Sequence, residues 1–180
     1  MQTKGIVFSG SGGQGVITAS IIMAEAAVIR EGLNAVQTQV YGPEARGGAT
    51  RADIIISDQL IHYPKVINPH VLVCLTQEAY GKFSGIVRPG GLLLMDPHFV
   101  RSAHKVNARQ VELNMYKGVM ERIGKPIVFN ICMLGALISM TGLLKAESII
   151  SVLKTKIAPE FIELNRAALE LGLELGSNSE

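Results

Sequence analysis

The sequence predicts an α/β fold, a three-layer α/β/α sandwich around a mostly parallel, Rossmann-like sheet. Short apolar runs alternate with helical patterns along the chain. The runs are almost unbroken in Val, Ile and Leu, which is typical of strands buried on both faces. A glycine-rich loop joins the first run to the first helical pattern, as in the first βα turn of nucleotide-binding sheets. The 180 residues contain no repeat, low-complexity tract or linker, so we expect a single domain over residues 1–176 and a frayed polar tail at 177–180.

The strands are placed by the apolar runs. They are expected at residues 5–9, 35–40, 52–57, 71–75 and 92–95, with a further strand near 111–114. Asp53 and Asp58 flank the apolar residues 54–56 and are expected to mark the ends of that strand. The turn at residues 88–91, Arg-Pro-Gly-Gly, separates the fifth run from the segment before it.

The helices follow from the 3.6-residue periodicity. We expect them at residues 15–30, in a short segment from 76, and at 116–123, 130–140, 146–155 and 159–171. Residues 127–144 carry no charge and approach the minimum length of a membrane span. Pro126, the internal polar residues and Gly142 instead favour a buried helix, so no membrane partner is expected. Gly135 would let a neighbouring element approach that helix closely.

The glycine loop after the first strand is the first candidate binding element. Its candidate positions are Gly10, Gly12, Gly13, Gln14 and Gly15. The spacing satisfies G-x-G-x-x-G, and such a loop can offer backbone N–H groups and a helix N-terminus to an anion. A dinucleotide site also needs an acid about twenty residues further on, where this chain has Gln37, Thr38 and Gln39. A dinucleotide site is therefore disfavoured, and two interpretations remain: an anion site, or glycines that only let the first helix pack tightly on the sheet.

The segment after the second strand is the second candidate element. Its candidate residues are Tyr41, Glu44, Arg46, Gly47, Gly48 and Arg51. The segment leaves the carboxyl end of a strand, where open α/β sheets bind ligands. Glu44 and Arg46 can pair and brace the turn, or Arg46 and Arg51 can meet a phosphate or carboxylate. Residue chemistry leaves both interpretations open.

Composition limits the partners and the compartment. The net charge is +2 and the basic residues are scattered, so no nucleic-acid partner is expected. The start of the chain leads directly into the first strand without a signal peptide, which favours a cytoplasmic protein. Hydrophobic residues make up 48% and charged residues 18%, which indicates either a surface covered by a partner subunit or a well-buried core.

Residues for catalysis or metal binding are scarce. Cys74 and Cys132 lie in apolar segments, are expected to be buried thiols, and are too few for an all-cysteine iron–sulfur cluster. The four histidines lack metal-binding spacing and a neighbouring nucleophile. We therefore assign no catalytic and no metal-binding residue. The best-placed exception is Asp96-Pro97-His98, because strand ends collect functional groups in this architecture.

Several motifs in this order resemble one family. They are Gly-x-Gly-Gly-Gln-Gly at 10–15, Tyr-Gly-Pro-Glu-Ala-Arg-Gly-Gly at 41–48, Tyr-Pro-Lys at 63–65, Gln-Glu-Ala-Tyr at 77–80, Asn130 with Leu-Gly-Ala-Leu at 134–137, and Phe-Ile-Glu-Leu-Asn at 161–165. From residue 6 to about 172 the chain resembles the γ subunit of the 2-oxoacid:ferredoxin oxidoreductases. The arginine loop at 41–51 is the most specific part of this resemblance.

The resemblance implies a γ subunit of a hetero-oligomeric, coenzyme A-acylating oxidoreductase that decarboxylates a 2-oxoacid and passes electrons to ferredoxin. It favours the 2-oxoglutarate type over the pyruvate, branched-chain and indolepyruvate types. Thiamine diphosphate, magnesium and the iron–sulfur clusters are then expected in partner subunits, and the isolated chain is expected to be inactive. The glycine and arginine loops would face the partners near the shared active site, with coenzyme A as a candidate contact. The alternatives are a stand-alone nucleotide-binding α/β enzyme and a purely structural interaction module.

Overall fold

The sheet has the predicted α/β topology with one reversed strand. The computed structural model describes residues 3–40 and 49–179. Its strands are β1 (Lys4–Gly10), β2 (Asn34–Val40), β3 (Thr50–Ser57), β4 (Val71–Cys74), β5 (Leu92–Met95) and β6 (Arg109–Glu112), in the order β2-β3-β1-β4-β5-β6. β1, β4, β5 and β6 pair in parallel, whereas β3 is antiparallel to both β1 and β2. Nine residues separate the end of β2 from the start of β3, whereas a parallel pair needs a crossover of about a dozen residues or more.

The helices also lie close to the predicted ranges. They are α1 (Val16–Glu25) continuing as the π-helical turn η1 (Ala26–Arg30), α2 (Gln77–Phe83), η2 (Ser84–Ile86), α3 (Met115–Arg122), η3 (Pro126–Val128), α4 (Phe129–Thr141), α5 (Ala146–Lys156), η4 (Pro159–Phe161) and α6 (Ile162–Ser177). α6 extends beyond the predicted end at residue 171 and includes the first residue of the expected frayed tail. In the described part of the chain, no helix combines the length and apolar character needed to cross a membrane.

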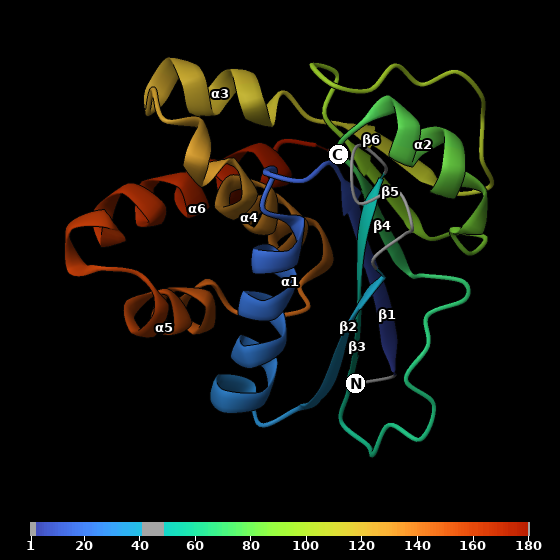
Figure 1. Ribbon diagram of the computed structural model, residues 1–180, viewed down its shortest axis with the longest axis horizontal. Coiled ribbons are helices and arrows are strands. Elements are labelled where there is room, and N and C mark those ends of the chain that lie inside the picture. Colours follow the sequence, from blue (N-terminus) through green and yellow to red (C-terminus); the bar gives the residue numbers. More distant parts are fainter. Residues whose placement is uncertain (1–2, 41–48, 180) are drawn as a thin grey trace.

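The sheet separates two apolar cores (Figure 1). In β1, Ile6 and Phe8 join the larger core under α1, α3, α4, α5 and α6, whereas Val7 points into a smaller core under α2. The same alternation holds in β4, where Val73 faces the larger core and Leu72 the smaller one. Strands buried on both faces explain why the sequence shows unbroken apolar runs rather than an alternating pattern.

Glycines allow α4 and α6 to pack backbone against backbone. A Cβ added to Gly172 of α6 would lie 2.8 Å from the backbone N of Ala136 and would meet the carbonyl of Cys132 even more closely. A Cβ on Gly135 of α4 would overlap the carbonyl of Leu169 in the same way. The predicted close approach at Gly135 is therefore confirmed, and the uncharged segment forms a helix that is buried over most of its length.

Candidate functional site

The glycine loop is held in shape by the side chain of Gln14. Its Oε1 accepts a hydrogen bond from the N–H of Ser11 (2.8 Å), and its Nε2 donates to the carbonyl of Leu75 at the end of β4 (2.8 Å). A Cβ on Gly10 would lie 2.5 Å from that Oε1, so glycine is required for the brace to form. The sequence indicates Gln14 as a binding candidate. In the structure both its amide oxygen and its amide nitrogen form hydrogen bonds within the chain.

The remaining loop glycines divide into packed and open positions. Gly15 has φ +71° and caps α1; a Cβ there would lie 2.6 Å from Nδ2 of Asn130 on α4. Gly13 also adopts a left-handed conformation, with φ +92°. A Cβ on Gly12 or Gly13 would meet nothing within 4 Å. The two interpretations of the loop therefore apply to different residues: tight packing at Gly15, and open backbone at Gly12 and Gly13.

The open glycines line a cavity of about 710 Å³. Its other walls come from α1, from the start of β3, from η3 and α4, and from the region where α5 gives way to α6. Most of the lining is apolar, and Ile127 (81% exposed) and Phe161 (51% exposed) stand at the solvent side. The volume falls in the range of about 300–1,000 Å³ that small-molecule sites occupy.

One charged side chain lines this cavity within the described residues. It is Lys156, at the end of α5, and its Nζ lies 2.7 Å from Oε1 of Glu25 on α1. Asn165 of α6 also lines the cavity and is 6% exposed, and its Nδ2 donates to the carbonyl of Phe161 (2.9 Å). The sequence around Lys156 does not indicate that this side chain lines a cavity, because Lys156 reaches the cavity only through the packing of α5 on α1. Phe161 and Asn165 stand out in the sequence only through the family resemblance.

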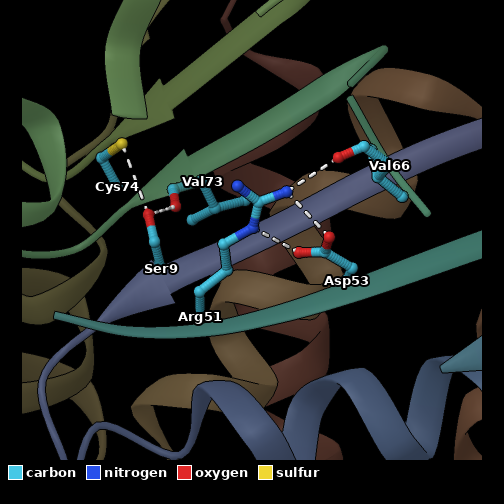
Figure 2. Close-up of polar contacts among 6 residues, drawn as sticks. All are labelled: Ser9, Arg51, Asp53, Val66, Val73 and Cys74. Atoms are coloured by element: carbon cyan, nitrogen blue, oxygen red, sulfur yellow. Dashed lines mark hydrogen bonds and ion pairs between the residues drawn. The ribbon is translucent and has the colours of Figure 1, made fainter. Parts of the chain in front are cut away.

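Arg51 points away from this cavity. Its guanidinium makes a bidentate ion pair with Asp53, with Nε–Oδ1 2.6 Å and Nη2–Oδ2 2.7 Å, and also donates to the carbonyl of Val66 (2.9 Å), as Figure 2 shows. The ring of Phe83 lies beneath it at 5.4 Å. Residues 51 and 53 share one face of β3, the face toward α2, whereas Thr50 on the opposite face lines the cavity.

Asp53 is accordingly a residue of the strand interior. The expectation that it marks the strand boundary was wrong, because β3 begins at Thr50 and the Arg51 pair compensates the charge of the nearly buried carboxylate.

The other candidates of the second loop, Tyr41, Glu44, Arg46, Gly47 and Gly48, lie outside the described residues. The described residues on either side place the ends of this segment. Val40 pairs with Arg51 at the carboxyl end of β2, and the N–H of Ala49 donates to Oε1 of Glu78 on α2 (3.2 Å). The segment therefore leaves and re-enters the sheet at the edge that also carries the glycine loop.

Asp96 after β5 connects backbone segments. It is fully buried, its Oδ1 accepts from the N–H of His98 (2.9 Å), and its Oδ2 accepts from the N–H of Tyr116 at the start of α3 (2.7 Å). Burial raises the pKa of this carboxyl, and the two N–H groups oppose the rise. His98 stacks on the Tyr116 ring with centroids 4.3 Å apart. The geometry fixes the turn to α3, and neither Asp96 nor His98 lines the large cavity.

Both cysteines are free and buried, as predicted. Burial raises the pKa of the Cys74 thiol to about 11 and that of Cys132 to about 12. Among the described residues, no three His, Cys, Asp or Glu side chains gather in a way that would hold a metal ion.

Comparison with known proteins gives a consistent picture. Residues 5–175 match the model of the family described as pyruvate ferredoxin/flavodoxin oxidoreductase. The 2-oxoglutarate synthase subunit KorC of Methanocaldococcus jannaschii is 42% identical over 96% of this chain and 93% of that protein. The pyruvate synthase subunit PorC of Methanothermobacter marburgensis is 32% identical over 94% of this chain and 95% of that protein.

Solved structures agree in fold. The γ subunit of the keto/oxoacid ferredoxin oxidoreductase from Geobacter sulfurreducens superposes with a TM-score of 0.91 at 38% identity, covering 99% of both chains. The 2-oxoglutarate:ferredoxin oxidoreductase from Magnetococcus marinus, solved with 2-oxoglutarate, coenzyme A and succinyl-CoA, shares the fold with a TM-score of 0.89 at 20% identity. This chain covers 32% of that longer chain. The chain belongs to the pyruvate ferredoxin/flavodoxin oxidoreductase family, and its fold is that of the oxidoreductase γ subunit.

Proposed function

We propose that this chain is the γ subunit of a 2-oxoglutarate:ferredoxin oxidoreductase. The observation that carries the proposal is the 42% identity to a 2-oxoglutarate synthase subunit over nearly the whole of both chains, against 32% to a pyruvate synthase subunit. The reaction releases CO₂ from 2-oxoglutarate, transfers the succinyl group to the thiol of coenzyme A, and passes two electrons to ferredoxin with release of a proton. Pyruvate or a branched-chain 2-oxoacid is the alternative substrate within the same reaction.

The catalytic cofactors are assigned to partner subunits. The described residues present no cluster of metal ligands and hold their two thiols buried and protonated. We therefore place thiamine diphosphate, magnesium and the iron–sulfur clusters on other chains of a cytoplasmic complex, which also receives ferredoxin. The chain's own contribution is a shaped surface at the carboxyl edge of its sheet.

That surface is proposed to contact coenzyme A. The open N–H groups at Gly12 and Gly13 stand at the start of α1, where an anion is favoured, and coenzyme A carries phosphates. The apolar wall of the cavity suits the uncharged arm of the same molecule. Arg51 is paired with Asp53 and Lys156 with Glu25, so the additional cation is assigned to Arg46.

The identity of the complex is tested by purifying it with this chain as bait. The purified complex is assayed for coenzyme A-dependent reduction of a low-potential dye by 2-oxoglutarate, pyruvate and branched 2-oxoacids in parallel. A thiamine-binding subunit and a cysteine-rich subunit should co-purify, with activity on 2-oxoglutarate. Recovery of this chain alone with a bound nucleotide would support the stand-alone enzyme instead.

Coenzyme A contact is tested separately in that complex. Gly12→Val adds bulk at the open cavity wall, whereas Gly85→Val in η2 adds the same bulk where a Cβ also meets nothing within 4 Å, but on the α2 side. Gly12→Val and Arg46→Ala should each raise the KM for coenzyme A about tenfold, equivalent to about 1.4 kcal/mol, and Gly85→Val should leave it unchanged. An unchanged KM in both of these variants, with the complex intact, would remove coenzyme A from this surface.

A further inference from the structure

A second cavity, of about 470 Å³, lies at the opposite edge of the sheet from the glycine loop. Its lining includes the amino-terminal ends of the parallel strands: Lys4 begins β1, Leu92 begins β5 and Arg109 begins β6. His70 and Arg88 complete its polar wall, and the end of α4 closes it. Neither the proposed function nor the family resemblance uses this surface.

The cavity concentrates positive charge. Lys4, Arg88 and Arg109 line it with no carboxylate among the described lining residues, and none of the three forms an ion pair with a described residue. The carboxyl end of α4 contributes roughly half an elementary negative charge. Three full positive charges therefore outweigh this partial negative charge several-fold.

His70 and Arg88 lie in direct contact at the wall of the cavity. Its Nδ1 accepts a hydrogen bond from the N–H of Gly5 (3.1 Å), so in the neutral ring the proton sits on Nε2. That Nε2 faces Nη1 of Arg88, which can only donate. Burial, together with the positive charges of Arg88 and Lys4, lowers the pKa of His70.

The backbone fixes the cations in place. The N–H of Arg88 donates to the carbonyl of Pro69 (3.1 Å), and the N–H of Arg109 donates to that of Gly91 (2.8 Å). A Cβ on Gly91 would lie 2.9 Å from the carbonyl of His70, so the turn can close against β4 only with glycine. The site is thus preorganised at the backbone, which reduces the entropy lost when an anion binds.

We propose that this cavity binds a phosphate-bearing small molecule carrying at least two negative charges, with a diphosphate group as the recognised chemistry. A single carboxylate would leave most of the positive charge uncompensated, and the volume exceeds that of one small anion while matching small-molecule sites. Arg88 and Arg109 supply fork-shaped donors suited to phosphate oxygens. Nη2 of Arg109 also donates to the carbonyl of Ser179 (2.6 Å).

The test is titration of inorganic pyrophosphate into the full chain and into the assembled complex by calorimetry at low ionic strength. Binding should be saturable, should weaken as salt is added, and should fall at least tenfold in the Arg88→Gln/Arg109→Gln double variant. Arg101→Gln, an exposed arginine elsewhere on the surface, is the matched control and should bind as the wild type does. In NMR spectra the ring signals of His70 should shift on binding, and those of the exposed His62 should not.

The proposal is overturned if the double variant binds pyrophosphate as tightly as the wild type, or if Arg101→Gln weakens binding equally. Binding by the isolated chain that disappears in the complex would overturn it as well, and would assign the patch to an acidic surface of a partner subunit. These outcomes are independent of the Gly12→Val test of coenzyme A contact, because Gly12 lies at the other edge of the sheet.

Discussion

Replacing Gly172 by alanine should destabilise the fold at the contact between α4 and α6. The added Cβ would lie 2.8 Å from the N of Ala136 and 2.9 Å from the carbonyl carbon of Cys132. Both atoms belong to the α4 backbone, so no side-chain rotation relieves the overlap and the helices must separate. Overpacking costs about 1–3 kcal/mol, and the upper end applies because backbone blocks backbone. Alanine is more favourable than glycine in a helix interior by about 1 kcal/mol. The net decrease in the free energy of unfolding is therefore about 2 kcal/mol.

Thermal unfolding of the purified chain measures this loss. For a chain of this size about 2 kcal/mol lowers Tm by about 4–8 °C. Gly118→Ala on α3 is the matched control, since its Cβ would sit 3.5 Å from Cδ2 of Leu171, an ordinary contact. That variant should be stabilised by the higher helix propensity of alanine, and its Tm should rise by about 2–4 °C. A Gly172→Ala protein as stable as the wild type would refute the reasoning, because the same substitution would then have no packing cost where the backbones touch.

Further predictions concern local features. Hydrogen bonds from the Ser148 hydroxyl and the Lys145 N–H lower the pKa of Glu31. The stabilisation by Glu31 is therefore present above its ordinary pKa of 4.5 and is lost as the pH falls through the lowered value. Glu31→Gln should cost about 1 kcal/mol at pH 7 in urea unfolding, and the difference should shrink as the pH falls below 4.5. Cys74 and Cys132 should resist a thiol reagent at pH 8 in the folded chain and react on unfolding, and modification at native rates would contradict their burial. Arg51→Lys should lower stability by about 1–3 kcal/mol because an ammonium cannot form the bidentate pair; no loss would show that the pair is dispensable. Gly15→Ala should cost at least about 1 kcal/mol because φ is positive there, and unchanged unfolding would contradict the loop geometry.

The strands β1, β3, β4 and β5 were predictable because their apolar runs are buried on both faces of the sheet. The predicted range 92–95 coincides with β5, and the other strands differ by at most a few residues at each end. The reversed direction of β3 was missed in the sequence, although the nine residues between β2 and β3 are too few for the crossover that a parallel pair needs.

The site was predictable only where it depends on backbone. Gly12 and Gly13 are open at a cavity and Gly15 is in tight contact, both consequences of missing Cβ atoms that the glycine spacing reveals. The partner of Arg51 is set by the two-residue period of a strand, which becomes readable once β3 is known to begin at Thr50. Lys156 and Ile127 reach the cavity from distant helices, and nothing local in their segments indicates it.

The central claim is that this chain is an obligatory subunit of a 2-oxoglutarate:ferredoxin oxidoreductase. The most direct measurement is ferredoxin reduction by the partner subunits, purified without this chain and then recombined with it, in the presence of 2-oxoglutarate and coenzyme A. The account predicts that 2-oxoglutarate- and coenzyme A-dependent reduction appears only after recombination, in stoichiometric proportion to the added chain. Full activity without the chain, or activity after recombination on pyruvate but not on 2-oxoglutarate, would contradict it.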